Sequence, residues 1–104
     1  HSFIFQDICR SLRFTNAKSG VALSNHVIVD FKVEDEEHCR LKCYMEKTCF
    51  SYNYGPSLAR VHGFTCELND VDASSHPDDL QPRDGFVYQT AQVNIIISSN
   101  QFCE

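Results

Sequence analysis

Several features that would indicate particular functions are missing from this sequence. It contains no tryptophan, no H-E-x-x-H or G-x-S-x-G motif, and no N-x-S/T sequon. The missing motifs leave no recognisable hydrolase centre and no acceptor for N-glycosylation. The sequence also lacks an apolar run of the length that a membrane-spanning helix requires, about 18 residues. We therefore expect neither enzyme activity nor insertion into a membrane.

Cysteine, by contrast, is abundant. Of 104 residues, six are cysteine, and 42% are hydrophobic. Such a short chain builds only a small core and gains stability from covalent cross-links. An even number of cysteines indicates disulfides, and disulfides indicate an oxidising compartment. The composition predicts a single domain over residues 1–104, secreted or on the extracellular face of the cell surface.

The stretch from residue 34 to residue 68 contains four of the six cysteines: Cys39, Cys43, Cys49 and Cys66. Acidic residues 34–37 open this stretch and Lys47 follows, which is the order that a helix dipole favours. We therefore predict a helix over residues 35–47, capped by Glu34 or Asp35. Residues 50–54 alternate aromatic and polar side chains, so they predict a strand, and 63–68 predict a second.

This stretch resembles the PAN/apple domain family. The resemblance is carried by the spacing C-x3-C-x5-C from Cys39, the Ser-Tyr-Asn-Tyr segment from Ser51, and the Cys-Glu-Leu segment at Cys66. Cys9 and Cys103 match the additional pair of the apple-type members, so the resemblance covers nearly the whole chain. It implies a non-catalytic extracellular binding module.

The resemblance also implies a disulfide pairing: Cys9–Cys103, Cys39–Cys66 and Cys43–Cys49. The residues alone do not select this pairing, because six cysteines can be joined in many ways. A rival interpretation assigns the four central thiols, with His38 and His62 nearby, to zinc. Their spacing differs from that of the cysteine pairs in zinc knuckles, so we expect no metal and no cofactor.

The rest of the chain predicts mainly strands. These lie at residues 3–5, 10–15, 21–23, 26–31 and 85–93, with a turn at 16–20, a hairpin formed by 21–23 and 26–31, a polar loop at 69–84, and a short apolar run at 95–97 that needs cover. One helix and short connections between strands predict the α+β class. The expected architecture is a single helix packed on a curled five- or six-stranded antiparallel sheet and stapled by disulfides, as the resemblance also implies.

Charge is distributed unevenly along the chain. Residues 1–33 contain four bases and two acids, whereas residues 34–104 contain five bases and twelve acids. Nucleic acid, heparin and anionic membranes all require a dense basic face. Some PAN domains bind heparin at positions corresponding roughly to Lys32, Lys42 and Lys47, but here the neighbouring acidic residues crowd these lysines. We expect no nucleic-acid partner and no strong heparin binding.

Five aspartates lie between Asp70 and Asp84 and offer the hard oxygen donors that calcium prefers. Their order does not fit an EF-hand, because Ser75 and Gln81 occupy the positions of its required glycine and glutamate. Two interpretations remain, a solvated acidic loop and a calcium site of another type.

The expected function is protein binding or adhesion as one module of a larger protein, with an extracellular protein or a glycan as partner. Carbohydrate recognition and a structural role in the extracellular matrix, through residues 95–97, are the alternatives. The candidate contact residues are Arg60 and His62 in the 55–63 loop, Tyr52 and Tyr54 as stacking platforms, and Lys42 and Lys47 as basic contacts. Core packing is the competing interpretation of the tyrosines, and a solvated helix face is that of the lysines.

Overall fold

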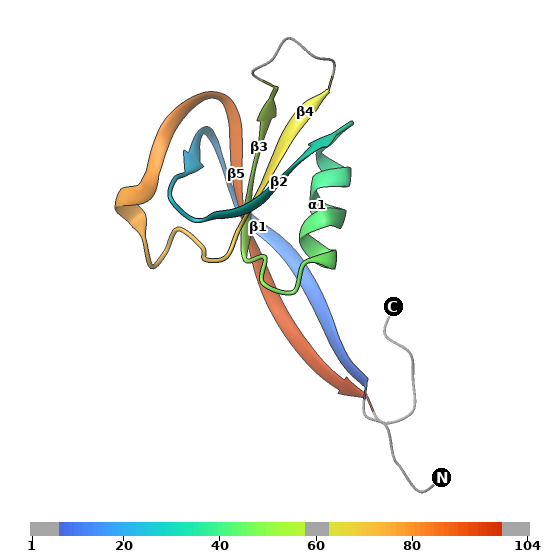
Figure 1. Cartoon of the computed structure of the whole chain (residues 1–104). Helices are drawn as coiled ribbons and strands as arrows, with labels where there is room; N and C mark the ends of the chain where they lie inside the picture. The colour runs from blue at the N-terminus through green and yellow to red at the C-terminus, as the bar shows by residue number, and fades with distance from the viewer. Residues whose placement is uncertain (1–6, 58–62, 99–104) are drawn as a thin grey trace, which may run out of the picture.

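Five antiparallel strands form one sheet, and one helix packs on one face of it (Figure 1). The computed structural model describes residues 7–57 and 63–98, with the side chains of 10–57 and 63–94. The elements are β1 (Asp7–Leu23), β2 (Val27–Val33), α1 (Glu36–Met45), β3 (Ser51–Pro56), β4 (Phe64–Asn69) and β5 (Leu80–Ser98), in the sheet order β1-β5-β3-β4-β2. This architecture confirms the predicted α+β class.

Helix α1 begins where the sequence supplies a cap. The Asp35 carboxylate accepts a hydrogen bond from the His38 backbone N–H at 2.8 Å, and Glu36 and Glu37 follow in the first turn. The capping bond satisfies a free N–H group, and the two carboxylates offset the partial positive charge at the amino end of the helix. The helix ends at Met45, two residues earlier than predicted, because the chain turns there toward Cys49.

Two of the three disulfides implied by the resemblance are confirmed. Cys39–Cys66 joins α1 to β4, and Cys43–Cys49 closes the bend after α1. All four cysteines are fully buried. The zinc interpretation of these thiols is therefore wrong. Cys103 lies outside the described residues, so Cys9–Cys103 stays a prediction.

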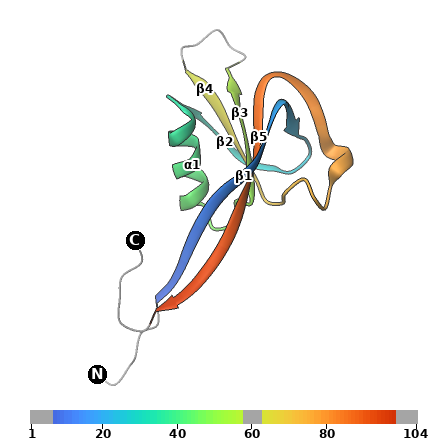
Figure 2. The ribbon, with the colours of Figure 1, turned by 180° about the vertical axis from the view of Figure 1, so that it is seen from behind.

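Strand β1 is much longer than predicted. It runs through residues 16–20, where we expected a turn, and it pairs with β5 from Asp7↔Ser98 to Leu23↔Leu80. The turn-like residues instead form bulges: the register shifts between Thr15 and Lys18 and again between Ser19 and Val21, and Asn16 has a positive φ of 59°. An extra residue in a strand increases its twist, so β1 and β5 form a long twisted ribbon that extends beyond the other strands (Figures 1 and 2).

The predicted hairpin of residues 21–23 and 26–31 is wrong. β1 pairs with β5 and β2 pairs with β4, so these two segments belong to opposite edges of the sheet. The backbone N–H and C=O of Leu23 are both bound by the Asn53 side chain, at 2.8 and 2.9 Å. This long-range contact occupies the groups that a local hairpin would use. The polar loop is also shorter than predicted, because β5 begins at Leu80.

Side chains on the two faces of the sheet form two packing layers. The layer beneath α1 contains Tyr52, Leu68 and Val33, with Leu12 and Phe14 packed against it. The opposite layer contains Leu23, Phe86 and Tyr88, all at most 2% exposed. A Cβ atom at Gly55 would lie 2.5 Å from the Phe86 ring, so only glycine fits this close approach.

Candidate functional site

A polar groove lies on the face of the sheet away from α1. Two cavities of about 530 and 440 Å³ share Asn16 and Thr90 and together form this groove. Tyr88 and Thr90 point into this face because they alternate with Gln89, whose amide contacts Tyr52 beneath α1. The remaining lining residues are Thr15, Lys18, Phe50, Asp72, Ala73, Ser74, Pro77, Leu80, Ala91, Gln92 and Val93.

The segment after β4 forms one wall of the groove. The Ala73 backbone N–H donates to the Tyr88 hydroxyl at 2.7 Å, and that hydroxyl lies 3.0 Å from Thr90 Oγ1. The Asp72 carboxylate accepts from the backbone N–H of Ser74 at 3.0 Å. The bond from Ala73 to Tyr88 holds the wall against β5, and the bond from Ser74 to Asp72 stabilises the turn within the wall.

The groove combines hydroxyl, amide and charged groups with two aromatic residues, the buried Tyr88 and the exposed Phe50. Phe50 is 40% exposed and lines the same cavity as Thr15, Gln92 and Asp72. Polar groups that orient a ligand, beside an exposed ring on which a sugar or an extended peptide rests, are typical of binding sites. The sequence does not predict this groove, because bulged β1, β5 and the segment after β4 meet there only in three dimensions.

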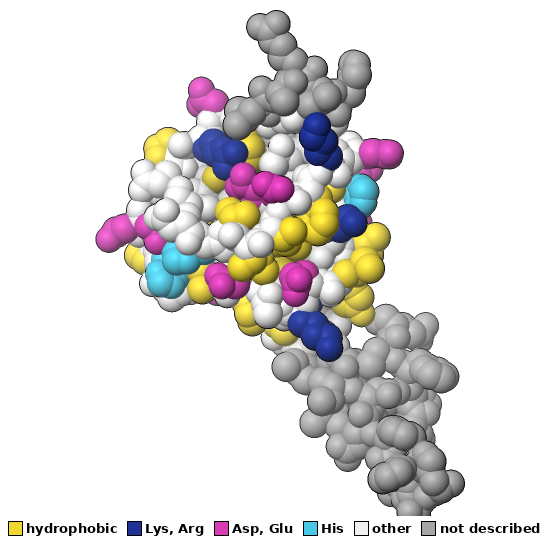
Figure 3. Space-filling model, viewed as in Figure 1, with side chains coloured by type: hydrophobic (Ala, Val, Ile, Leu, Met, Phe, Trp, Pro, Cys, Tyr) yellow, Lys and Arg dark blue, Asp and Glu magenta, His cyan; other side chains and the backbone are white. Residues whose placement is uncertain are grey.

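The outer face of α1 is a second candidate. Leu41, Tyr44 and Met45 are exposed by 53%, 39% and 69%. Their spacing of three and four residues places them on one side of the helix, opposite the buried Cys39 and Cys43. We call these three residues the apolar stripe. Figure 3 shows hydrophobic side chains exposed in the region of α1.

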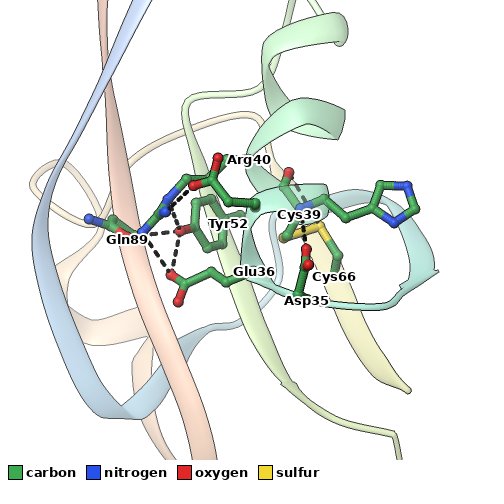
Figure 4. A network of polar contacts seen from close by, with 9 residues as sticks. Asp35, Glu36, Cys39, Arg40, Tyr52, Cys66 and Gln89 are labelled. Atoms are coloured by element: carbon green, nitrogen blue, oxygen red, sulfur yellow. Dashed lines mark hydrogen bonds and ion pairs between the residues drawn. A yellow bond between two sulfur atoms is a disulfide. The ribbon is translucent and has the colours of Figure 1, made fainter. Parts of the chain in front are cut away.

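Tyr52 lies in the core and does not form a stacking platform. Its side chain is fully buried, with the hydroxyl 2.6 Å from Glu36 Oε2 and 2.8 Å from Gln89 Oε1 (Figure 4). The hydroxyl also accepts a bond from Arg40 Nε at 3.2 Å. Burial, and then the bond to Glu36, raises the pKa of Tyr52. The network joins α1 to β3 and β5, and the buried ring has no exposed face for stacking.

The other predicted contact residues are separated. Tyr54 is partly buried, and its ring lies 5.1 Å from that of Phe64, at the ends of β3 and β4 that precede and follow the 58–62 segment. The Lys42 Nζ atom lies 4.6 Å from the centre of the Phe31 ring, whereas Lys47 is exposed beyond the end of α1. Arg60 and His62 lie outside the described residues.

No dense basic face is visible on the side of the molecule shown in Figure 3, where lysine and arginine side chains lie apart with acidic side chains between them. Arg40 contacts Glu36 and Glu37, and Arg83 bonds to Glu67 at 2.9 Å. Paired guanidinium groups attract a polyanion weakly. Within the described residues, no helix is long and apolar enough to cross a membrane.

The aspartates between Asp70 and Asp84 do not converge on one another. Asp72 bonds within its own turn to Ser74, and Asp79 lies 2.8 Å from His26. The bond from His26 lowers the pKa of Asp79. Among the described residues, the one convergent group of metal-ligand side chains combines Asp79 with two histidines, His26 and His76.

Comparison with known proteins adds one finding to this geometry. The sequence model described as the PAN domain matches residues 9–93, more than half of the chain. No curated protein and no solved structure matches the chain.

Proposed function

The chain belongs to the PAN domain family, and from this premise we propose that it is a non-catalytic extracellular module whose partner is another extracellular protein. The family is one of protein- and carbohydrate-binding modules, and the buried disulfides fit an oxidising compartment. We further propose that the module is one part of a larger multidomain protein at the cell surface or in the secreted space.

The apolar stripe is the observation that carries the proposal of a protein partner. The solvent face of a helix on a globular domain is ordinarily polar, whereas Leu41 and Met45 are more than half exposed. Apolar side chains gathered on a surface mark sites of protein contact. Methionine and tyrosine are also enriched at such interfaces. Figure 1 places α1 on the outside of the sheet.

Acidic substitutions in the stripe are expected to abolish partner capture. The double variant Leu41→Glu/Met45→Glu places two charges on the contact surface, and capture should fall at least about 10-fold because each charge would have to be desolvated. The assay immobilises the full chain and quantifies, by mass spectrometry, the proteins that it retains from an extract of extracellular matrix.

The matched control is Ile28→Glu, which makes the same type of change at a residue of β2 that is 42% exposed. Proteins retained by the natural sequence and by Ile28→Glu, but lost with the stripe variant, support the proposal. Equal retention by all three forms contradicts it. Size-exclusion chromatography tests self-association. If the natural sequence self-associates and the stripe variant does not, the partner of the stripe is a second copy of the chain.

Glycan binding is a second candidate, which the polar groove favours. An exposed ring beside hydroxyl and amide groups suits a sugar, which stacks its apolar face and bonds through its hydroxyls. Phe50→Ala should lower binding on a glycan array about 10-fold. Phe64→Ala is the control, because Phe64 is 39% exposed and Phe50 is 40% exposed. Array signals that are absent, or that fall equally with both variants, contradict this function for the groove.

The 55–63 loop stays a sequence-based proposal for a contact with either type of partner. Arg60 and His62 lie within it, and Tyr54 lies at its start with its ring against Phe64. Lys42 and Lys47 are proposed only as accessory contacts, since Lys42 is engaged with the Phe31 ring.

A further inference from the structure

Three metal-ligand side chains from two distant segments meet beside the end of β1. His26 lies between β1 and β2, His76 precedes the short 3-10 helix Pro77–Asp79, and Asp79 ends that helix. One ligand atom from each lies within 4.8 Å of the other two. His26 Nε2 is 2.8 Å from Asp79 Oδ2, and the two imidazole rings have centroids 4.3 Å apart.

Backbone hydrogen bonds fix this group in place. Ser24 N–H donates to Asp79 O at 2.8 Å, Asp70 N–H donates to His26 O at 3.2 Å, and Asp79 N–H donates to His76 O at 3.1 Å. The side chains of His26 and Asp79 are only 18% and 31% exposed. Backbone hydrogen bonds therefore hold the three ligand side chains in place, and these side chains are still accessible to solvent.

We propose that His26, His76 and Asp79 bind Zn²⁺, with a water molecule as the fourth ligand. Two imidazoles and one carboxylate are a donor set that zinc accepts, whereas calcium prefers oxygen ligands only. Ligand atoms around tetrahedral zinc lie about 3.3 Å apart. His26 Nε2 and Asp79 Oδ2, at 2.8 Å, would separate slightly, and small side-chain rotations would adjust the remaining distances, which are within 4.8 Å. The cation would replace the hydrogen bond between His26 Nε2 and Asp79 Oδ2.

The surrounding residues suit a bound cation. Asn25 Nδ2 donates to Asp79 Oδ1 at 3.3 Å, which leaves Oδ2 directed at His26. A second-shell donor of this kind orients a ligating carboxylate. Pro77 lies between His76 and Asp79 and lines the polar groove. Zinc would therefore hold the wall of the groove against the connection between β1 and β2.

The test titrates ZnCl₂ into the full chain by isothermal calorimetry. The natural sequence is expected to bind one equivalent through this group, and His76→Gln to bind at least about 10-fold more weakly, since loss even of a second-shell partner costs about 10- to 100-fold. His38→Gln is the matched control, because His38 is on α1 and outside the group. Its affinity should equal that of the natural sequence.

A second measurement guards against a variant that unfolds. The thermal midpoint is recorded with and without ZnCl₂ for each form, and only ligands bound by the folded state raise it. The natural sequence and His38→Gln should gain stability with zinc, and His76→Gln and His26→Gln should gain much less while folding normally without metal. The proposal is overturned if the natural sequence shows no saturable binding, or if His76→Gln and His38→Gln bind zinc equally.

Discussion

Cys39→Ala/Cys66→Ala is expected to lower the free energy of unfolding by about 3 to 4 kcal/mol. The two residues are 27 apart in sequence, and in the chain-entropy model a loop of that length accounts for this value. Alanine is the better replacement, because both sites are fully buried and a serine hydroxyl there would have to find a partner. Urea unfolding followed by circular dichroism measures the change.

The second confirmed disulfide provides the comparison. Cys43 and Cys49 are only 6 apart in sequence, so Cys43→Ala/Cys49→Ala should cost about 2 kcal/mol. We expect removal of Cys39–Cys66, which closes the longer loop, to lower the free energy of unfolding more than removal of Cys43–Cys49 does. If removal of Cys39–Cys66 cost less than removal of Cys43–Cys49, loop length would not determine how much each of these two disulfides stabilises the fold.

The features that depend on neighbouring residues in the sequence were predicted best. The start of α1 was predictable because Asp35 and the two glutamates after it form a local capping signal. Strands β3 and β4 were predictable from alternation within six-residue segments. The pairing Cys39–Cys66 was implied by the family resemblance, since local chemistry does not choose a partner for a cysteine.

Features that depend on distant contacts were not predictable in the same way. Residues 16–20 have the composition of a turn, but pairing with β5 makes them part of a bulged strand. The hairpin prediction failed because Asn53 binds Leu23 across 30 residues of chain. The polar groove and the group of His26, His76 and Asp79 both join segments that are far apart in sequence, so no local pattern predicts them.

The Arg10 side chain, from strand β1, binds the carbonyl groups at the end of α1 and in the bend that follows it. Its Nη1 donates to the carbonyl oxygens of Tyr44 and Glu46 at 2.9 and 2.8 Å and to that of Cys43 at 3.3 Å, and Nη2 donates to Cys49 O at 2.6 Å. Carbonyl groups at the end of a helix carry partial negative charge, and Cys43 O and Glu46 O also accept backbone bonds from Glu46 N–H and Cys49 N–H at 3.2 and 3.0 Å. Arg10 is partly buried, and this burial lowers its pKa.

Arg10→Met should therefore destabilise the domain by about 2 to 4 kcal/mol, because several carbonyl groups lose a charged donor together. Arg10→Lys should recover only part of this loss, since an ammonium group lacks the planar fork that reaches four oxygens. Arg13→Met is the control: Arg13 is exposed on the same strand. Urea unfolding gives the magnitude, and hydrogen exchange should show lost protection in the amides that follow α1. If Arg10→Met were as stable as Arg13→Met, the guanidinium contacts would add nothing to the stability of the helix end.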